Sequence, residues 1–185
     1  MFETNVPNLL TVFRMLLVPV LVAVLLSETS IGDGLAAAVF ALATLTDVLD
    51  GWIARRQRQE TNFGKLMDPL ADKLLVTAAL VSLVSLDRVA AGVAMVIIAR
   101  ELAVTGLRQI AMEQGHVIAA SKWGKLKTLC QVAMVLVLIL VDTRGLAVDL
   151  LVYVTVAVTV LSGADYFFGL RRLLTDRHEQ APDQA

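Results

Sequence analysis

The chain has 185 residues, of which 57% are hydrophobic and 18% are charged, and its mean hydropathy is +0.74. An average soluble domain is about 45–50% apolar and about 25% charged, so this composition excludes an ordinary water-soluble domain and a disordered chain. The net charge of −1 argues against a general nucleic-acid-binding protein, and the single cysteine, Cys130, excludes an internal disulfide and a cysteine-based zinc site. The sequence therefore predicts a small polytopic membrane protein.

Six apolar stretches are long enough to cross a bilayer, which takes about 20 mostly apolar residues in a helix. In chain order they cover residues 6–27, 35–56, 66–86, 89–112, 123–142 and 146–170. Polar turns separate most of them, the first over residues 27–34. We expect an all-α fold of six transmembrane helices around a polar cavity open to the cytoplasm. One membrane domain would cover residues 1–174, followed by a polar tail over 175–185.

The distribution of Lys and Arg predicts the orientation, because basic residues favour the cytoplasmic side. The connections between the second and third stretches and between the fourth and fifth are basic, as is the C-terminal tail. The opposite side holds only Arg88 and Arg144. Both termini are therefore expected in the cytoplasm, and in a bacterium-like cell the membrane would be the inner membrane. The first stretch contains Arg14 and has no basic leader and no small-residue cleavage site, so we do not expect a signal peptide.

Four carboxylates interrupt the second and third apolar stretches. They are Asp47, Asp50, Asp68 and Asp72. Each would cost about 2.5–3.5 kcal/mol at the centre of a membrane helix, and acids in such positions are functional by default. The first two are three residues apart and the last two are four apart, so each pair shares one helix face. Two helix ends joined by a short loop can face each other, which would bring the four acids together.

Unpaired carboxylates at close range repel one another and stay ionised together only if a cation binds them. Oxygen-only ligands suit Mg²⁺, Mn²⁺ or Ca²⁺, and four acids beside Arg and Lys suggest a two-metal site that handles a phosphate ester. Gly51 would let a ligand approach the backbone, and Arg55 lies four residues further on, on the same side. The alternative is a set of Asp–Arg ion pairs between helices, although pairing alone does not require four acids at these spacings.

A second polar set lies on the fourth and fifth stretches. Glu101, Thr105 and Arg108 are spaced to form one helical stripe. The cations expected around it are Arg100, Arg108, Lys122, Lys125 and Lys127, with Thr128 beside them. Such a pocket would suit a soluble anion such as a phosphate. For Lys122 and Lys127, anchoring of the helix ends to lipid headgroups is an equally open interpretation.

Read in order, Asp47-Val48-Leu49-Asp50-Gly51-Trp52-Ile53-Ala54-Arg55, followed by Gly64, Asp68 and Asp72, resembles the signature of the CDP-alcohol phosphotransferase family. The resemblance extends to segments 8–14, 98–108 and 123–128. These segments are most similar to the bacterial branch whose acceptor is glycerol 3-phosphate.

The resemblance implies six transmembrane helices, usually in a homodimer, and two divalent cations, Mg²⁺ or Mn²⁺, held by the four acids. It also implies CDP-diacylglycerol as the donor. The residues that would contact its cytidine and phosphates are Asn8, Thr11, Gly51, Arg55 and Thr61. Asp72, the last acid of the motif, would be the general base, and the cations of the second polar set would hold the phosphate of the acceptor.

The expected activity is transfer of a phosphatidyl group from CDP-diacylglycerol to sn-glycerol 3-phosphate, with release of CMP. A related enzyme with another acceptor remains possible: inositol phosphate, or phosphatidylglycerol as in one type of cardiolipin synthase. The basic pocket disfavours serine and choline, which carry no phosphate. A cation or proton transporter is an alternative of another class, but the acids cluster at one membrane side instead of lining a path across. A scaffold without catalysis is a third alternative.

Overall fold

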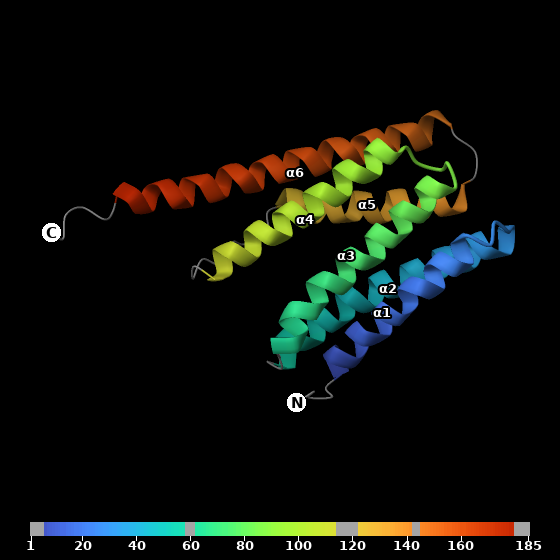
Figure 1. The fold of residues 1–185 in the computed structure, drawn as a ribbon, viewed down its shortest axis with the longest axis horizontal. Coiled ribbons are helices and arrows are strands. Elements are labelled where there is room, and N and C mark those ends of the chain that lie inside the picture. The colour runs from blue at the N-terminus through green and yellow to red at the C-terminus, as the bar shows by residue number, and fades with distance from the viewer. Residues whose placement is uncertain (1–5, 58–61, 114–121, 142–144, 180–185) are drawn as a thin grey trace.

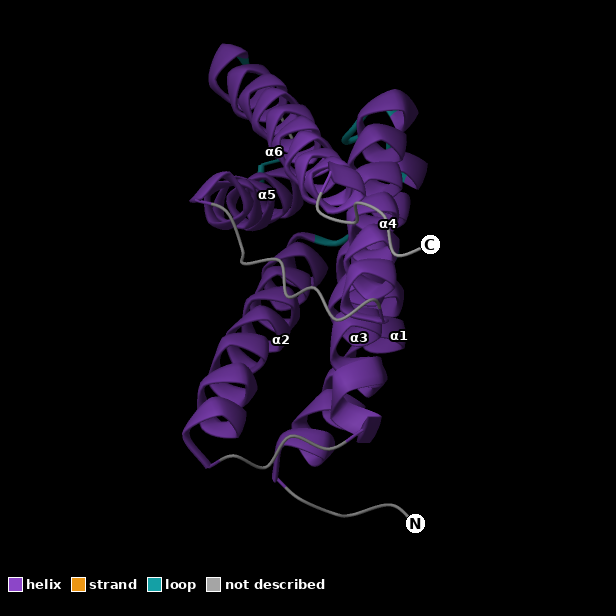
Figure 2. Ribbon diagram, turned by 90° about the vertical axis from the view of Figure 1, so that its left-hand side faces the viewer, coloured by secondary structure: helices purple, strands orange, loops and turns teal. Residues whose placement is uncertain are grey.

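Six helices make up the part of the chain that the structure, a computed structural model, describes: residues 6–57, 62–113, 122–141 and 145–179 (Figure 1). Side chains are described at residues 9–29, 31–47, 67, 70–112, 123–141 and 145–169. The helices are α1 (Val6–Leu25), α2 (Ser30–Gln57), α3 (Asn62–Ser85), α4 (Ala91–Glu113), α5 (Lys122–Leu140) and α6 (Leu146–Glu179). These ranges contain no strand (Figure 2), which confirms the all-helical prediction.

Several helix ends differ from the sequence prediction, and the start of α2 and the end of α6 differ the most. α2 begins at Ser30, inside the turn predicted over residues 27–34. The Thr29 hydroxyl accepts a hydrogen bond from the Gly32 backbone N–H at 3.0 Å and so caps the helix early. α6 continues to Glu179, five residues into the predicted tail, because no glycine or proline stops it there.

The helices pack in an order that brings α3, α4 and α5 together beside the predicted site. α1 packs on α2 and α3, α5 packs on α2 and α6, and α4 packs on α3 and α6. Fully buried apolar side chains fill the contacts, among them Leu21, Phe40, Leu80, Ile97 and Met134. In Figure 1 the start of α1 and the ends of α2, α4 and α6 lie at the same end of the bundle.

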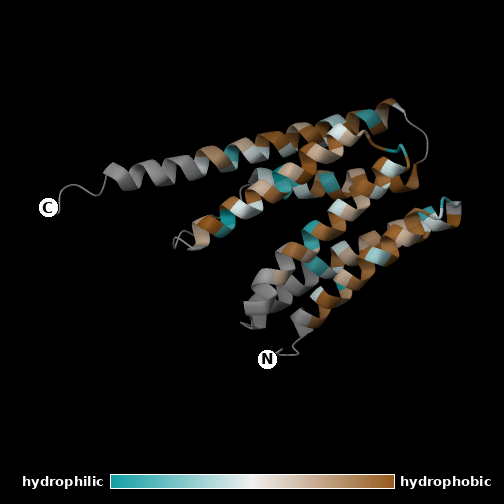
Figure 3. Cartoon of the chain, in the orientation of Figure 1, coloured by the Kyte–Doolittle hydropathy of each residue, from teal (hydrophilic) through white to brown (hydrophobic). Residues whose placement is uncertain are grey.

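Many large apolar side chains are exposed on the bundle, and Figure 3 shows that hydrophobic residues predominate along the described helices. Leu16 is 64% exposed and Tyr153 is 70% exposed. Two described segments, Trp123–Leu140 and Leu146–Gly169, are long and apolar enough to cross a membrane, and Leu9–Leu25 forms a shorter apolar helix. This exposed apolar surface fits a membrane protein, because water-soluble monomers rarely expose large continuous apolar patches.

Hydrogen bonds from Arg88 connect the turn between α3 and α4 to α2 and α5 at the other end of the bundle. Arg88, between α3 and α4, donates two hydrogen bonds to the Asp33 carboxylate of α2 at 3.0 and 2.8 Å. It also donates to the Ile139 backbone carbonyl of α5 at 2.7 Å. Asp33 precedes Asp47 by fourteen residues, or roughly 21 Å along α2. The Arg88 contacts therefore hold α2 in place at a distance from the predicted acidic site.

Candidate functional site

The first predicted acid, Asp47 on α2, forms an ion pair with α1. Its Oδ1 lies 2.7 Å from Nη1 of Arg14, which is fully buried. Thr11 is also buried and lies three residues before Arg14, on the same face of α1. The sequence analysis assumed that the acids are unpaired. For Asp47 this assumption is wrong, because the Arg14 guanidinium of the neighbouring helix balances the carboxylate.

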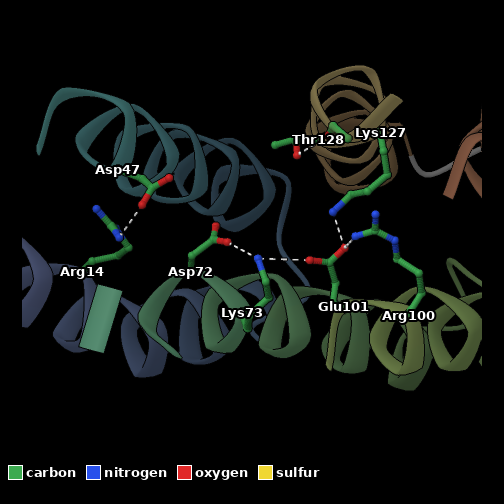
Figure 4. Close-up of polar contacts among 9 residues, drawn as sticks. Arg14, Asp47, Asp72, Lys73, Arg100, Glu101, Lys127 and Thr128 are labelled. Atoms are coloured by element: carbon green, nitrogen blue, oxygen red, sulfur yellow. Dashed lines mark hydrogen bonds and ion pairs between the residues drawn. The ribbon is translucent and has the colours of Figure 1, made fainter. Parts of the chain in front are cut away.

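The last predicted acid, Asp72 on α3, also has a cationic partner. The Lys73 ammonium forms a short ion pair with Asp72 Oδ2, and its Nζ lies 3.0 Å from Glu101 Oε2 on α4 (Figure 4). One ammonium therefore joins two carboxylates on neighbouring helices. The sequence analysis gave Lys73 no role in the site; a lysine beside a predicted site acid within an apolar helix was the signal available to find it.

Glu101 is the centre of this network. It is 5% exposed, and its carboxylate contacts cations from three helices. Besides Lys73, Lys127 of α5 forms a close ion pair with Oε1, and Arg100 Nη1 lies 3.2 Å from the same oxygen. Figure 4 shows the three cations converging on Glu101 from different sides. The carboxylate thus ties α3, α4 and α5 together.

The charges within this network do not balance. Among the side chains that the structure describes, three cations, Lys73, Arg100 and Lys127, contact two carboxylates, those of Asp72 and Glu101. Buried charges need partners, so a surplus positive charge in a largely buried cluster favours an anion as a ligand. The arrangement is suited to a phosphate group beside Asp72.

Two of the predicted anion-binding residues, Arg100 and Lys127, therefore meet at one point. Arg108 is exposed and lies over the Tyr166 ring of α6, its Cζ 5.8 Å from the ring centroid. Lys125 is exposed, and the Thr128 hydroxyl donates to the Gly124 carbonyl of its own helix at 3.1 Å. Seven predicted residues lie outside the described side chains: Asn8, Asp50, Gly51, Arg55, Thr61, Asp68 and Lys122.

The described acids fit a hard divalent cation in their chemistry. Asp47 and Asp72 present carboxylate oxygens from facing helices, α2 and α3 (Figure 4), and each is about one-third exposed. Oxygen donors of this kind suit Mg²⁺ or Mn²⁺. Among the described side chains no group of three potential metal ligands is found, and two of the four predicted ligands lie outside that set. Arg14 and Lys73 supply positive charge at the two acids in this structure.

Comparison with known proteins identifies the family. The family model described as CDP-alcohol phosphatidyltransferase matches residues 4–161. The chain belongs to the CDP-alcohol phosphatidyltransferase family. This confirms the resemblance drawn from the acidic motif, which lies entirely within the matched segment.

Several curated proteins are similar to this family member along most of its length. A CDP-diacylglycerol--glycerol-3-phosphate 3-phosphatidyltransferase of Bacillus subtilis is 42% identical over 180 residues, covering 88% of this chain and 93% of the relative. The protein of the same name from Rickettsia prowazekii is 34% identical, covering 89% and 94%. A probable phosphatidylglycerophosphate synthase of Mycobacterium tuberculosis is 38% identical, covering 88% and 79%. None of these relatives is named as a transporter or a scaffold.

Replacing Glu101 with Gln tests the network in this family member. The substitution leaves three cations around one remaining carboxylate, so we expect a destabilisation of about 3–5 kcal/mol. Thermal unfolding in detergent should show a clearly lower midpoint than wild type. Adding Lys127→Gln should recover part of the loss, because it removes one of the surplus cations. An unchanged midpoint in Glu101→Gln would contradict the role of Glu101 as the centre of the network.

Proposed function

We propose that the protein transfers the phosphatidyl group of CDP-diacylglycerol to sn-glycerol 3-phosphate, giving phosphatidylglycerophosphate and CMP. The names of its relatives support both substrates. The observation that carries the proposal is the buried cluster around Glu101, whose surplus positive charge lies next to Asp72. A phosphorylated acceptor would balance that charge, whereas serine or choline would not.

The acceptor's phosphate would bind the cations of α4 and α5. Arg100 and Lys127 converge at Glu101, and Arg108 follows two helical turns later on α4. Lys122 and Lys125 at the start of α5 would complete the site. Held there, the acceptor would present its 1-hydroxyl toward Asp72, which Lys73 links to the same cluster.

The proposed reaction is a displacement at the phosphorus nearest the diacylglycerol. The 1-hydroxyl oxygen forms the new P–O bond, the bond to the CMP oxygen breaks, and CMP leaves with its electron pair. Asp72 would accept the hydroxyl proton. A carboxylate is a weak base, so the action of Asp72 must depend on its close placement beside the hydroxyl. The contact with Lys73 holds the Asp72 carboxylate toward the α4 side of the site.

Asp47, Asp50, Asp68 and Asp72 would hold two divalent cations, Mg²⁺ or Mn²⁺. Bound there, the ions would neutralise the pyrophosphate of the donor and the charge that develops on the leaving oxygen. The donor would bind on the α1–α2 side through Asn8, Thr11, Gly51, Arg55 and Thr61. Thr11 lies one turn before Arg14, the partner of Asp47, on the face of α1 that meets α2, and this position supports the placement.

The six helices would all span the cell inner membrane, with both termini in the cytoplasm and the polar cavity open on that side. The common end shared by the start of α1 and the ends of α2, α4 and α6 supports this topology (Figure 1). The donor's acyl chains would then remain in the lipid while the soluble acceptor enters from the cytoplasm. A homodimer is the expected assembly.

The decisive experiment is an assay of purified protein with CDP-diacylglycerol and a panel of alcohols, with release of CMP as the measurement. Glycerol 3-phosphate should give the highest kcat/KM. Inositol phosphate and phosphatidylglycerol test the two closest alternatives. Faster CMP release with either of them would replace the proposed acceptor, and no release with any alcohol would reject the transferase proposal.

Replacing Arg108 with Ala should raise the KM for glycerol 3-phosphate about ten- to a hundredfold, the usual cost of losing hydrogen bonds to a charged group. The KM for CDP-diacylglycerol should change little. Gln109, its exposed neighbour on α4, provides the matched control, since Gln109→Ala should leave both constants unchanged. Equal effects of Arg108→Ala on the two substrates would remove Arg108 from the acceptor site.

A further inference from the structure

One face of α6 meets the arginines of α4. Ser162, Gly163 and Tyr166 are spaced to lie on the same side of α6, and α4 packs against this helix. The family match ends at residue 161, so these three residues lie outside the matched segment. The sequence pattern gave them no role.

Ser162 and Gly163 together determine where the Arg100 side chain runs. Arg100 Nη2 donates to the Ser162 hydroxyl at 2.7 Å, and Ser162 is almost completely buried. A Cβ atom at Gly163 would lie 3.2 Å from Arg100 Cγ, closer than side chains normally pack, so glycine leaves the room that the arginine uses. The Arg100 guanidinium, which comes from α4, therefore contacts both the Ser162 hydroxyl of α6 and the Glu101 carboxylate.

Tyr166 makes the corresponding contact with the second arginine. Its ring is 8% exposed, and the Arg108 guanidinium lies 5.8 Å from the ring centroid. That distance is within the range of a cation–π interaction. The Tyr166 hydroxyl is buried and has no hydrogen-bond partner among the described residues, so the ring face is the contact that the structure assigns to this side chain.

We propose that α6 is the positioning helix of the acceptor site: Ser162 orients Arg100, Tyr166 orients Arg108, and the two contacts together determine affinity for the phosphate of the acceptor. The inference rests on the proposed function, in which both arginines bind that phosphate. Ser162 and Tyr166 act through the arginines and are not catalytic residues. An arginine held in place by a ring or a hydroxyl loses less rotamer entropy when it binds a phosphate.

The test compares Tyr166→Leu with Tyr166→Phe in the full-length protein. Tyr166→Leu removes the ring, and the KM for glycerol 3-phosphate should rise about two- to fivefold while the KM for CDP-diacylglycerol and kcat stay the same. Tyr166→Phe keeps the ring and should keep the wild-type constants. Tyr153, an exposed tyrosine on the same helix, gives the matched control, because Tyr153→Leu should change neither constant. An unchanged KM in Tyr166→Leu, or equal changes for both substrates, would overturn the proposal.

Combining Tyr166→Leu with Arg108→Ala separates this inference from the proposed function. If Tyr166 acts through Arg108, the double variant should have the same KM for glycerol 3-phosphate as Arg108→Ala alone. Multiplied effects would overturn the positioning role of Tyr166 and leave the acceptor site standing. No effect of Arg108→Ala itself would instead contradict the proposed acceptor site.

Ser162→Ala is the second variant. It removes a single hydroxyl and so keeps the proposal testable if Tyr166→Leu does not fold. We expect the KM for glycerol 3-phosphate to rise about three- to tenfold, less than in Arg108→Ala, because Ser162 acts on the phosphate only through Arg100. Ser85, a partly exposed serine near the far end of α3, provides the control, and Ser85→Ala should leave both constants unchanged. A wild-type KM in Ser162→Ala would reject the contact with Arg100 as a determinant of affinity.

Discussion

Replacing Asp72 with Asn is expected to abolish phosphatidyl transfer while the protein stays folded and still binds CDP-diacylglycerol. Asparagine keeps the shape of the side chain but cannot accept the hydroxyl proton, so turnover should fall at least about a hundredfold, the smaller of the effects usual for a general base. Release of CMP measures turnover, and titration with CDP-diacylglycerol measures binding. Thermal unfolding in detergent reports on the fold.

The structure explains why the fold should survive this substitution. Lys73 loses its charged partner at Asp72, but its ammonium still lies 3.0 Å from Glu101, so no cation is left buried alone. Asp149, an exposed acid in the first turn of α6, is the matched control, and Asp149→Asn should retain full turnover. Near-wild-type turnover in Asp72→Asn would show that another group takes the proton.

Hydropathy was sufficient to predict the helices. Each of the six apolar stretches overlaps one helix, because an apolar run of membrane length must satisfy its backbone groups internally. The exceptions are at helix ends, where local contacts decide. The hydrogen bond from Gly32 to the Thr29 hydroxyl starts α2 within a segment whose polar composition predicted a turn.

The partners of the acids could not be predicted in the same way. Asp47 meets Arg14 and Lys73 meets Glu101 only because neighbouring helices are rotated so that these faces oppose each other. Spacing along one helix defines which residues share a face, but not which face of the next helix lies against it. The sequence singled out several residues of these ion pairs, namely Asp47, Asp72, Arg100, Glu101 and Lys127, as candidates, while their pairing required the packed structure.

These ion pairs bear on the expected effect of removing divalent cations. We expect a chelator to stop transfer completely and to leave the protein folded. Arg14 and Lys73 already balance Asp47 and Asp72, so the fold does not depend on a metal ion for charge balance at these two acids. CMP release with EDTA, then with added Mg²⁺ or Mn²⁺, measures the activity, and thermal unfolding under the same conditions measures the fold. Activity that persists in EDTA would contradict the proposed cation site.

Lys73→Gln tests whether the Lys73 ammonium competes with a divalent cation for the Asp72 carboxylate, its ion-pair partner. Without that competitor, Mn²⁺ should bind more tightly, and the stability that a ligand adds by binding only the folded state increases with the logarithm of its affinity. The rise in unfolding midpoint between EDTA and Mn²⁺ should therefore be larger in Lys73→Gln than in wild type. Lys125 is exposed, and the structure shows no contact between it and Asp72 or Glu101. Lys125→Gln should therefore show the same rise in unfolding midpoint as wild type. An equal rise in Lys73→Gln would mean that the ammonium and the divalent cation do not share Asp72.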